Sequence, residues 1–464
     1  MVTLAPVDLL LIAAYFAAVL LVGFLSSRRS SESAQYLLAG RSLTLPLFVM
    51  TLVSTWYGGI LGVGEFSYLY GISNWFIQGA PYYVFALLFA LLLAKRIRRT
   101  NFITIPDKLH EAYGKPAALL GAFLTFLLMT PAPYVLMLAV LLELVTGWGI
   151  FTCLLVGTVA TTVYLFTGGF RSDVYTDVLE FFLMFGGFAV ILPYAVSTYG
   201  GMEFLKNHLP PLHLTWHGGN TPQFILVWFL IALWTLVDPS FHQRCYAAKS
   251  PVVAQKGILW SILFWFIFDA MTASAGLYAR AALPGLAQPV MAYPLLAERV
   301  LPEGAKGLFY VGMLATIMST LNTLSFVSAT TLGRDIICRV KGWHDEVQEK
   351  SLVRWGLVAT GLLSITLAYA IPSVVRLWYV IGSSVVPGLL VPLVTSYFEH
   401  WKAPPHVAFF SMLTGWGTST GWLIWGYAER LGSAAHYPLG VEPMIPGLVV
   451  SSFVWWVGWR AVRR

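Results

Sequence analysis

Thirteen apolar stretches of membrane-spanning length constrain the fold of this chain more than any other feature of its sequence. About 20 apolar residues in a helix cross the hydrocarbon core of a bilayer, and a helix satisfies its own backbone hydrogen bonds there. With 464 residues, 58% hydrophobic and 11% charged, the chain has too little polar surface for a soluble protein. The sequence therefore predicts an all-α polytopic membrane protein, with one membrane domain over residues 1–464. The expected spans are 7–26, 45–71, 74–95, 117–145, 149–167, 174–199, 223–242, 255–283, 305–333, 352–371, 375–398, 405–428 and 443–461.

The connections between these spans alternate between rich and poor in Lys and Arg. The poor set holds Lys206, Arg280, Arg299, Lys306, Arg376 and Arg430. All the others of the 28 Lys and Arg residues lie in the opposite set, where Arg244 is expected in a loop with Lys249 and Lys256. Because cytoplasmic loops are enriched in basic residues, we expect a cell-membrane protein with its N-terminus outside and its C-terminus in the cytoplasm. The net charge of +7 then reflects topology beside an anionic lipid bilayer, and no nucleic-acid partner is expected.

The second span, 45–71, has the composition of a broken helix. Gly58-Gly59, Gly62 and Gly64 weaken it just past its centre. The polar residues at membrane depth are Ser54, Thr55 and Glu65. Irregular backbone at this depth is tolerated where it is buried in protein or lines a cavity. We expect freed carbonyl groups to hold a cation and the gap to hold a solute; a harmless kink is the alternative interpretation.

The seventh span, 223–242, is interrupted in the same way. Pro239 removes a backbone donor and disfavours helix at Asp238. Once the first span is set aside, the next ten spans form two sets of five, and each set begins with an interrupted helix. An odd number gives the sets opposite orientations, which is the pattern of an inverted repeat with its binding site between the breaks. The expected division is an extra N-terminal helix (7–26), repeat 1 (45–199), repeat 2 (223–398) and two C-terminal helices (405–464).

Four hydroxyl side chains of the ninth span lie on one helix face. They are Thr316, Ser319, Thr320 and Thr323, with Asn322 beside them. A hard cation such as Na⁺ prefers oxygen ligands, and hydroxyls with free carbonyls supply them. Serine and threonine also bond to the carbonyl one turn earlier or pack between helices. The stripe alone therefore leaves an ion site and a packing role both open.

Four motifs, in this order, resemble the signatures of the sodium/solute symporter family. They are Leu38-Ala-Gly-Arg-Ser42, Thr167-Gly-Gly-Phe-Arg-Ser-Asp-Val-Tyr-Thr-Asp177, Gln243-Arg-Cys-Tyr-Ala-Ala-Lys-Ser250 and Met318-Ser-Thr-Leu-Asn-Thr323, the last followed by Asp335. The resemblance covers about residues 36–398. It implies a secondary active transporter with a five-plus-five inverted-repeat core, in which Na⁺ is the coupling ion and a small organic solute moves with it by alternating access.

The resemblance also implies where ions bind. The implied main sodium site consists of the carbonyl oxygens of Leu52, Thr55 and Thr316 and the hydroxyls of Ser319 and Thr320. The implied second sodium site, or exit route for the ion, lies at Asp177, completed by Asn322 and Thr323. Asp173, Asp177 and Glu180 form a stripe at the inner end of the sixth span, and intramembrane acids are functional by default.

By the same resemblance, the solute should lie between the two breaks. The implied contacts are Trp56, Tyr57 and Glu65 on the first break, Trp234, Thr235 and Asp238 on the second, and Gln78 in the third span. Residues 54–65 and 95–115 are somewhat closer to the choline-transporter-like branch than to the sugar branch. Aromatic faces can stack on a sugar or hold an organic cation. An amine, a sugar, an amino acid and a carboxylate all stay open as the solute.

Two other functions fit the same residues. A proton-coupled symporter would use Asp177 or Glu65 as its proton carrier, and a sensor of the same fold would not transport. The sequence contains no HExxH motif, so we expect no enzyme. Glu143 and Asp269 also lie within apolar stretches, without an assigned role.

Overall fold

The computed structural model describes residues 2–27, 33–343, 345–428 and 437–462. Within these ranges the protein is built of helices and their connections, with a single isolated β-bridge between Leu43 and Ala248. Five of the basic residues that define the expected topology lie outside the described ranges: Arg28, Arg29, Arg430, Arg463 and Arg464.

Most of the long helices follow the expected spans, but residues 129–131 divide the expected span 117–145 between two of these helices. The long helices are α1 (Pro6–Ser27), α7 (Ile105–Leu128), α8 (Ala132–Thr146), α9 (Ile150–Tyr199), α14 (Pro251–Ala282), α16 (Ala305–Thr330), α18 (Glu346–Ala370), α19 (Val374–Ser396), α20 (Pro405–Ala428) and α21 (Met444–Ala461). The shorter helices are α2 (Ser33–Leu38), α3 (Leu45–Trp56), α4 (Ile60–Tyr70), α5 (Ala80–Phe89), α6 (Lys95–Arg99), α10 (Met202–His208), α11 (Pro222–Ile231), α12 (Trp234–Val237), α13 (Pro239–Ala247), α15 (Ala292–Val300) and α17 (Arg339–Lys341).

The number of membrane crossings is supported more coarsely than the sequence predicts. In the described part of the chain, nine helices are long and apolar enough to span a bilayer, or ten with the bent pair α3–α4. The protein is therefore a multi-pass membrane protein, and the exact number of thirteen stays a prediction. Helix α9 joins two expected spans and is interrupted at Gly169, which has a φ of 58°. Only glycine adopts such a conformation readily, which explains the break between those spans.

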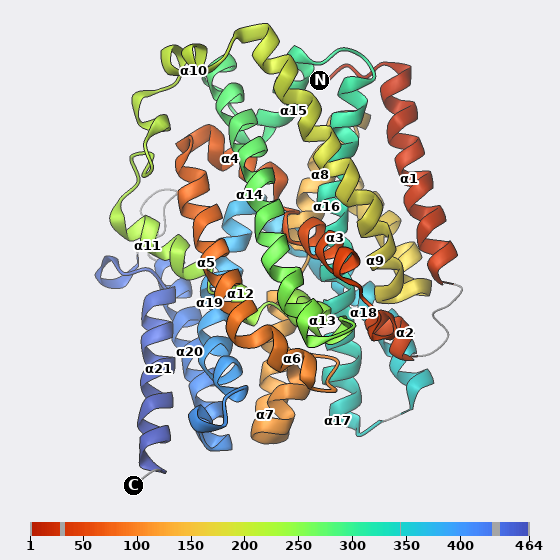
Figure 1. The fold of residues 1–464 in the computed structure, drawn as a ribbon. Coiled ribbons are helices and arrows are strands. Elements are labelled where there is room, and N and C mark those ends of the chain that lie inside the picture. The colour runs from red at the N-terminus through yellow and green to blue at the C-terminus, as the bar shows by residue number, and fades with distance from the viewer. Residues whose placement is uncertain (1, 28–32, 344, 429–436, 463–464) are drawn as a thin grey trace.

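The two termini lie at opposite ends of the molecule (Figure 1). The basic segments α6 and α17 lie at the end where the C-terminus leaves, whereas α10 lies at the end of the N-terminus (Figure 1). This arrangement agrees with the expected alternation of the connections. Helices α20 and α21 pack side by side, and Ser411 of α20 donates a hydrogen bond to the Ser451 carbonyl at 2.9 Å.

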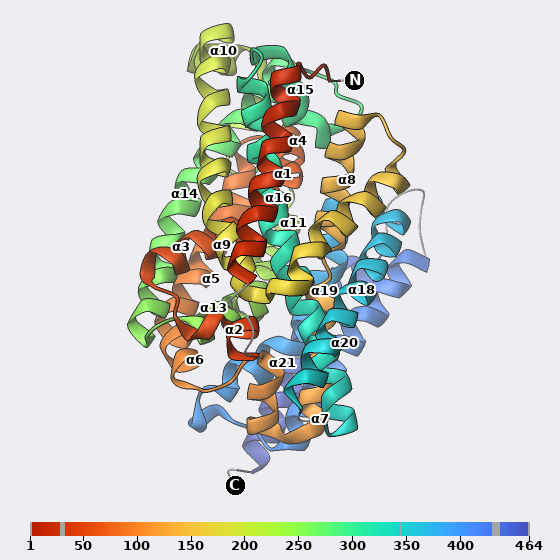
Figure 2. The ribbon, with the colours of Figure 1, turned by 90° about the vertical axis from the view of Figure 1, so that its right-hand side faces the viewer.

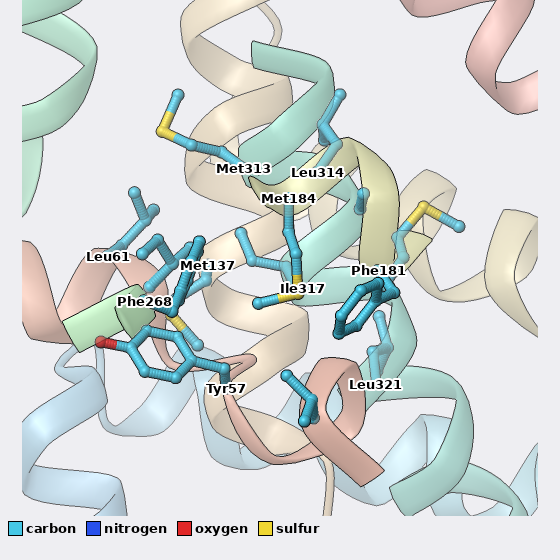
Figure 3. Close-up of a cluster of buried hydrophobic side chains, with 14 of the residues drawn as sticks. Tyr57, Leu61, Met137, Phe181, Met184, Phe268, Met313, Leu314, Ile317 and Leu321 are labelled. Atoms are coloured by element: carbon cyan, nitrogen blue, oxygen red, sulfur yellow. The ribbon is translucent and has the colours of Figure 1, made fainter. Parts of the chain in front are cut away.

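Helix α16 forms the centre of the molecule, and every residue of its most apolar 18-residue stretch is buried. It crosses α9 closely, because a Cβ on Gly187 would lie 2.9 Å from the Cα of Gly312. Around this crossing, α3, α8, α9, α14 and α16 contribute a cluster of buried apolar side chains that includes Tyr57, Met184 and Ile317 (Figure 3). Helix α1 lies over α9 and α16 (Figure 2), and its Gly23 carbonyl accepts a 2.7 Å hydrogen bond from Ser172.

The outer segment between α10 and α11 is docked onto the end of α4. The His213 carbonyl accepts a hydrogen bond from the Ile72 amide at 2.8 Å, and its ring Nε2 lies 3.0 Å from the Tyr68 carbonyl oxygen. Gly71, at the end of α4, has a φ of 68°, and a side chain there would overlap the His213 backbone. These contacts hold the segment as a cover over one end of the broken helix.

Candidate ion and solute site

The first break has the geometry expected from its glycines. Helix α3 ends at Trp56, α4 begins at Ile60, and the two are bent by 57°. A side chain on Gly58 would overlap the side chain of Thr320, and one on Gly59 would overlap the ring of Trp378. The glycines therefore let the broken backbone approach α16 and α19. The last carbonyl groups of α3 lack partners within their own helix and face other elements instead.

Helix α16 meets these carbonyl groups with hydroxyls. The Thr320 hydroxyl donates to the Thr55 carbonyl oxygen at 2.5 Å, and the Ser319 hydroxyl lies 3.5 Å from that of Thr55. Leu52 is fully buried one turn earlier on α3. The Thr316 hydroxyl donates to the Gly312 carbonyl of its own helix at 2.6 Å, which is the local bond that the alternative interpretation of the stripe anticipated.

The second break lies at Asp238 as expected. Asp238 has a ψ of 117°, and its Oδ1 accepts hydrogen bonds from the amides of Ser240 and Phe241 at 2.7 and 3.2 Å. The carboxylate thus caps α13 and stabilises its first turn. A further interruption between α11 and α12, which the sequence did not predict, isolates Trp234 in a short helix. A Cβ on Gly382 of α19 would lie 3.2 Å from this indole.

A cavity of about 140 Å³ lies between the two breaks. Five of the expected solute contacts line it: Trp56, Tyr57, Gln78, Trp234 and Asp238. Thr55 and Thr320 also reach it, so the cavity adjoins the hydroxyls of α16. Two expected contacts are not part of its lining: Thr235 is fully buried beside it, and Glu65 lies farther along α4.

Asp269 of α14 also lines the cavity, and the sequence offered no role for it. Its Oδ1 accepts a hydrogen bond from the Tyr57 hydroxyl at 2.5 Å, and its Oδ2 accepts one from Tyr83. The Tyr83 oxygen in turn accepts from the Trp75 indole at 3.0 Å. The position of Asp269 within an apolar span was the signal in the sequence that it could be functional. The missing information was which face of α14 meets the break.

Arg244 corrects the expected topology, because it lies inside the protein and not in a basic loop. It is fully buried in α13, and its Nη2 lies 3.2 Å from Asp177 Oδ2 and 3.8 Å from Asp173 Oδ2. The same nitrogen donates to the hydroxyls of Thr55 at 2.5 Å and Thr323 at 3.0 Å. The break at Asp238 starts a new helix, all of whose residues are buried, and this carries Arg244 inward.

Two residues expected at the second sodium site, Asp177 and Thr323, therefore come together around a guanidinium group. Asp177 Oδ1 accepts from Ser319 at 2.5 Å, and Asp173 accepts from Thr323. Asn322 is buried beside Thr323 on α16. Glu180, the third member of the acidic stripe, accepts from the Tyr15 hydroxyl of α1 at 2.9 Å. The acidic face of α9 thus points at α16 and α1, as its spacing indicated.

Comparison with known proteins decides the family. Residues 36–415 match the model of the sodium:solute symporter family. The chain belongs to this family. It is similar to the sodium/pantothenate symporter of Escherichia coli strain K12, with 27% identity over 96% of this chain and 95% of that protein. It is also similar to the high-affinity choline transporter 1 of Drosophila melanogaster, with 24% identity over 95% of this chain and 77% of the transporter.

A solved structure of a Na⁺-coupled sialic acid symporter shares the fold. It has a TM-score of 0.79 with 16% identity, and the match covers 98% of each chain. Membership of the sodium:solute symporter family makes this protein a transporter and not an enzyme, with Na⁺ as its coupling ion. The relatives carry the names of chemically different solutes, so family membership leaves the solute of this symporter undetermined.

Proposed function

We propose that this family member is a secondary active transporter that carries Na⁺ and a small organic solute in the same direction by alternating access. The observation that supports this most is the meeting of the first break with α16. The Thr55 carbonyl, Ser319 and Thr320 converge at the break, and Thr55 and Thr320 also line the cavity beside it. An ion and a solute can then both bind at the break between α3 and α4.

We assign the main sodium site to the carbonyl oxygens of Leu52, Thr55 and Thr316 with the hydroxyls of Ser319 and Thr320. All five residues are buried, with exposures of 2% or less. A hydroxyl that now donates to a carbonyl can rotate and offer its lone pairs to a cation instead. An ion held between α3 and α16 favours the conformation in which they stay together, and it shifts the equilibrium by its differential affinity for that state.

The second sodium site at Asp177, Asn322 and Thr323 stays a prediction with a condition attached. Arg244 already supplies a positive charge between Asp177 and Thr323. A second Na⁺ in this place requires the guanidinium to move. To act as the proton carrier of a proton-coupled symporter, Asp177 would have to give up its ion pair with Arg244.

We also propose the architecture that goes with this function: thirteen spans in one transport domain, with the N-terminus outside and two inverted repeats at 45–199 and 223–398. The breaks between α3 and α4 and at Asp238, which begin the two sets, support the repeat. The position of α6 and α17 at the end of the C-terminus supports the sidedness (Figure 1).

Uptake from a mixture of solutes into proteoliposomes tests the function. Vesicles in a mixture of amines, sugars, amino acids and carboxylates are given an inward Na⁺ gradient or an inward proton gradient, and their contents are measured by mass spectrometry. We expect one solute to accumulate under the Na⁺ gradient alone. Accumulation that follows the proton gradient supports the proton-coupled alternative, and binding without accumulation under either gradient supports the sensor.

A further inference from the structure

The charges on the cavity wall are all of one sign. Among the described lining residues there are two carboxylates, Asp238 and Asp269, and no Lys, Arg or His. Neither carboxylate forms an ion pair with any described residue, although Asp238 is buried and Asp269 half-buried. A carboxylate removed from water is costly unless an opposite charge or hydrogen bonds compensate it. Both carboxylates accept hydrogen bonds, but no described lining residue brings a positive charge to the wall, so a cation in the cavity would supply the missing counter-charge.

Two phenol groups hold the Asp269 carboxyl group in place as a hydrogen-bond acceptor. Both of its oxygens accept phenol hydrogen bonds, from Tyr57 and Tyr83. Because the Tyr83 oxygen accepts the Trp75 indole N–H, its own proton is directed to Asp269. The Tyr57 oxygen also lies 2.7 Å from the Thr272 hydroxyl, which fixes the phenol in place. The carboxylate is thus oriented by a built network at the edge of the cavity.

Aromatic rings form much of the rest of the wall. The Trp56 ring packs edge-on against Tyr82 at 5.3 Å and is tilted against Trp265 at 6.1 Å. Tyr134 and Trp378 form a second group, with ring centroids 6.3 Å apart, and all five rings line the cavity. The faces of Trp and Tyr attract cations by about 0.5–2 kcal/mol each. Rings that pack on one another are already ordered, so a ligand need not order them.

We propose that the solute is a small organic cation, with an ammonium group held between the aromatic wall and the carboxylates of Asp238 and Asp269. The proposal rests on the Na⁺-coupled function above and names its substrate class. A carboxylate solute would meet two like charges and no basic lining residue. A neutral sugar would bring no opposite charge to either carboxylate.

Binding of matched probes to the purified, Na⁺-loaded protein tests the proposal. Choline and 3,3-dimethylbutan-1-ol have the same shape, but only choline carries a charge. Tetramethylammonium, glucose and pantothenate complete the series, and binding is measured by isothermal titration calorimetry. We expect choline or tetramethylammonium to bind at least tenfold more tightly than the neutral isostere. We expect Asp269→Asn to weaken that binding at least tenfold, whereas Glu143→Gln, an exposed acid on α8, leaves it unchanged.

The results separate this inference from the proposed function. If glucose or pantothenate binds in Na⁺ and the cations do not, the substrate class is wrong and Na⁺ coupling stands. If no cation binds although Na⁺ still raises the melting temperature, the inference is also overturned. If Na⁺ itself has no effect on melting or on binding of any probe, the proposed function fails. Equal binding of choline and its isostere shows that shape, and not charge, is recognised.

Discussion

Replacing Arg244 with leucine tests the buried charge cluster beside the break. The guanidinium donates to Asp177 and to the hydroxyls of Thr51, Thr55 and Thr323. Its removal leaves Asp177 as an uncompensated charge in the core. Breaking a buried ion pair in this way costs about 3–5 kcal/mol. For a chain of 464 residues, we expect the melting temperature of the detergent-solubilised protein to fall by roughly 3–5 °C.

A double variant separates charge from packing. Asp177→Asn removes the carboxylate that Arg244 neutralises, so Arg244→Leu/Asp177→Asn should recover about 1–3 kcal/mol of the loss predicted by adding the single variants. Arg99→Leu, at an exposed position at the end of α6, is the control and should change stability by about 0.5 kcal/mol or less. The buried pair does not stabilise the protein as proposed if Arg244→Leu has the wild-type melting temperature. The same conclusion follows if the stability changes of the two single variants simply add in the double variant.

Three further predictions concern other parts of the structure. Gly58→Ala should abolish Na⁺-dependent stabilisation, because its methyl group overlaps Thr320, whereas Gly186→Ala, with nothing within 4 Å, should not; equal effects would contradict the close approach. Arg334 pairs with Asp107 at 3.0 Å and with Glu349 at 3.3 Å. Losing these ion pairs, worth about 1 kcal/mol, should expose the buried Cys338 more often. Arg334→Gln should therefore raise the rate of maleimide labelling of Cys338 roughly fivefold. An unchanged rate would show that these pairs do not shield Cys338. Burial lowers the pKa of His213, so the docked segment favours the neutral ring, and its contribution to stability is lost as pH falls below the ordinary value of 6.5. The protection of amides 209–218, relative to their intrinsic exchange rate at each pH, should fall from pH 7.5 to 5.5, and His213→Gln should remove this pH dependence.

The breaks could be predicted because their causes are local. Clustered glycines and an Asp-Pro pair act on the backbone of their own segment, and the structure has its interruptions at those residues. The hydroxyl stripe of α16 was equally predictable, since helix spacing places Ser319 and Thr320 on one face. Which hydroxyl turns toward α3 was not, and Thr316 instead bonds its own helix.

Arg244 and Asp269 could not be placed from the sequence, and for different reasons. A basic residue near the end of an apolar span is typical of a loop, and only the direction of α13 after its break carries Arg244 inward. Asp269 lies in an unbroken helix whose inner face depends on tertiary packing, and its partners Tyr57 and Tyr83 come from distant segments. Glu65, which the resemblance implied as a solute contact, lies on α4 beyond the break and is not part of the cavity lining.

Equilibrium binding of radiolabelled Na⁺ to the purified protein tests the central claim most directly. Ser319→Ala and Thr320→Ala should each raise the Na⁺ concentration for half-maximal binding by roughly tenfold, about 1.4 kcal/mol. Thr414→Ala removes a similar hydroxyl, which bonds the Phe410 carbonyl of α20 at 2.7 Å, and should bind Na⁺ as the wild-type protein does. If both α16 variants bind Na⁺ with wild-type affinity, the ion does not lie between the first break and α16.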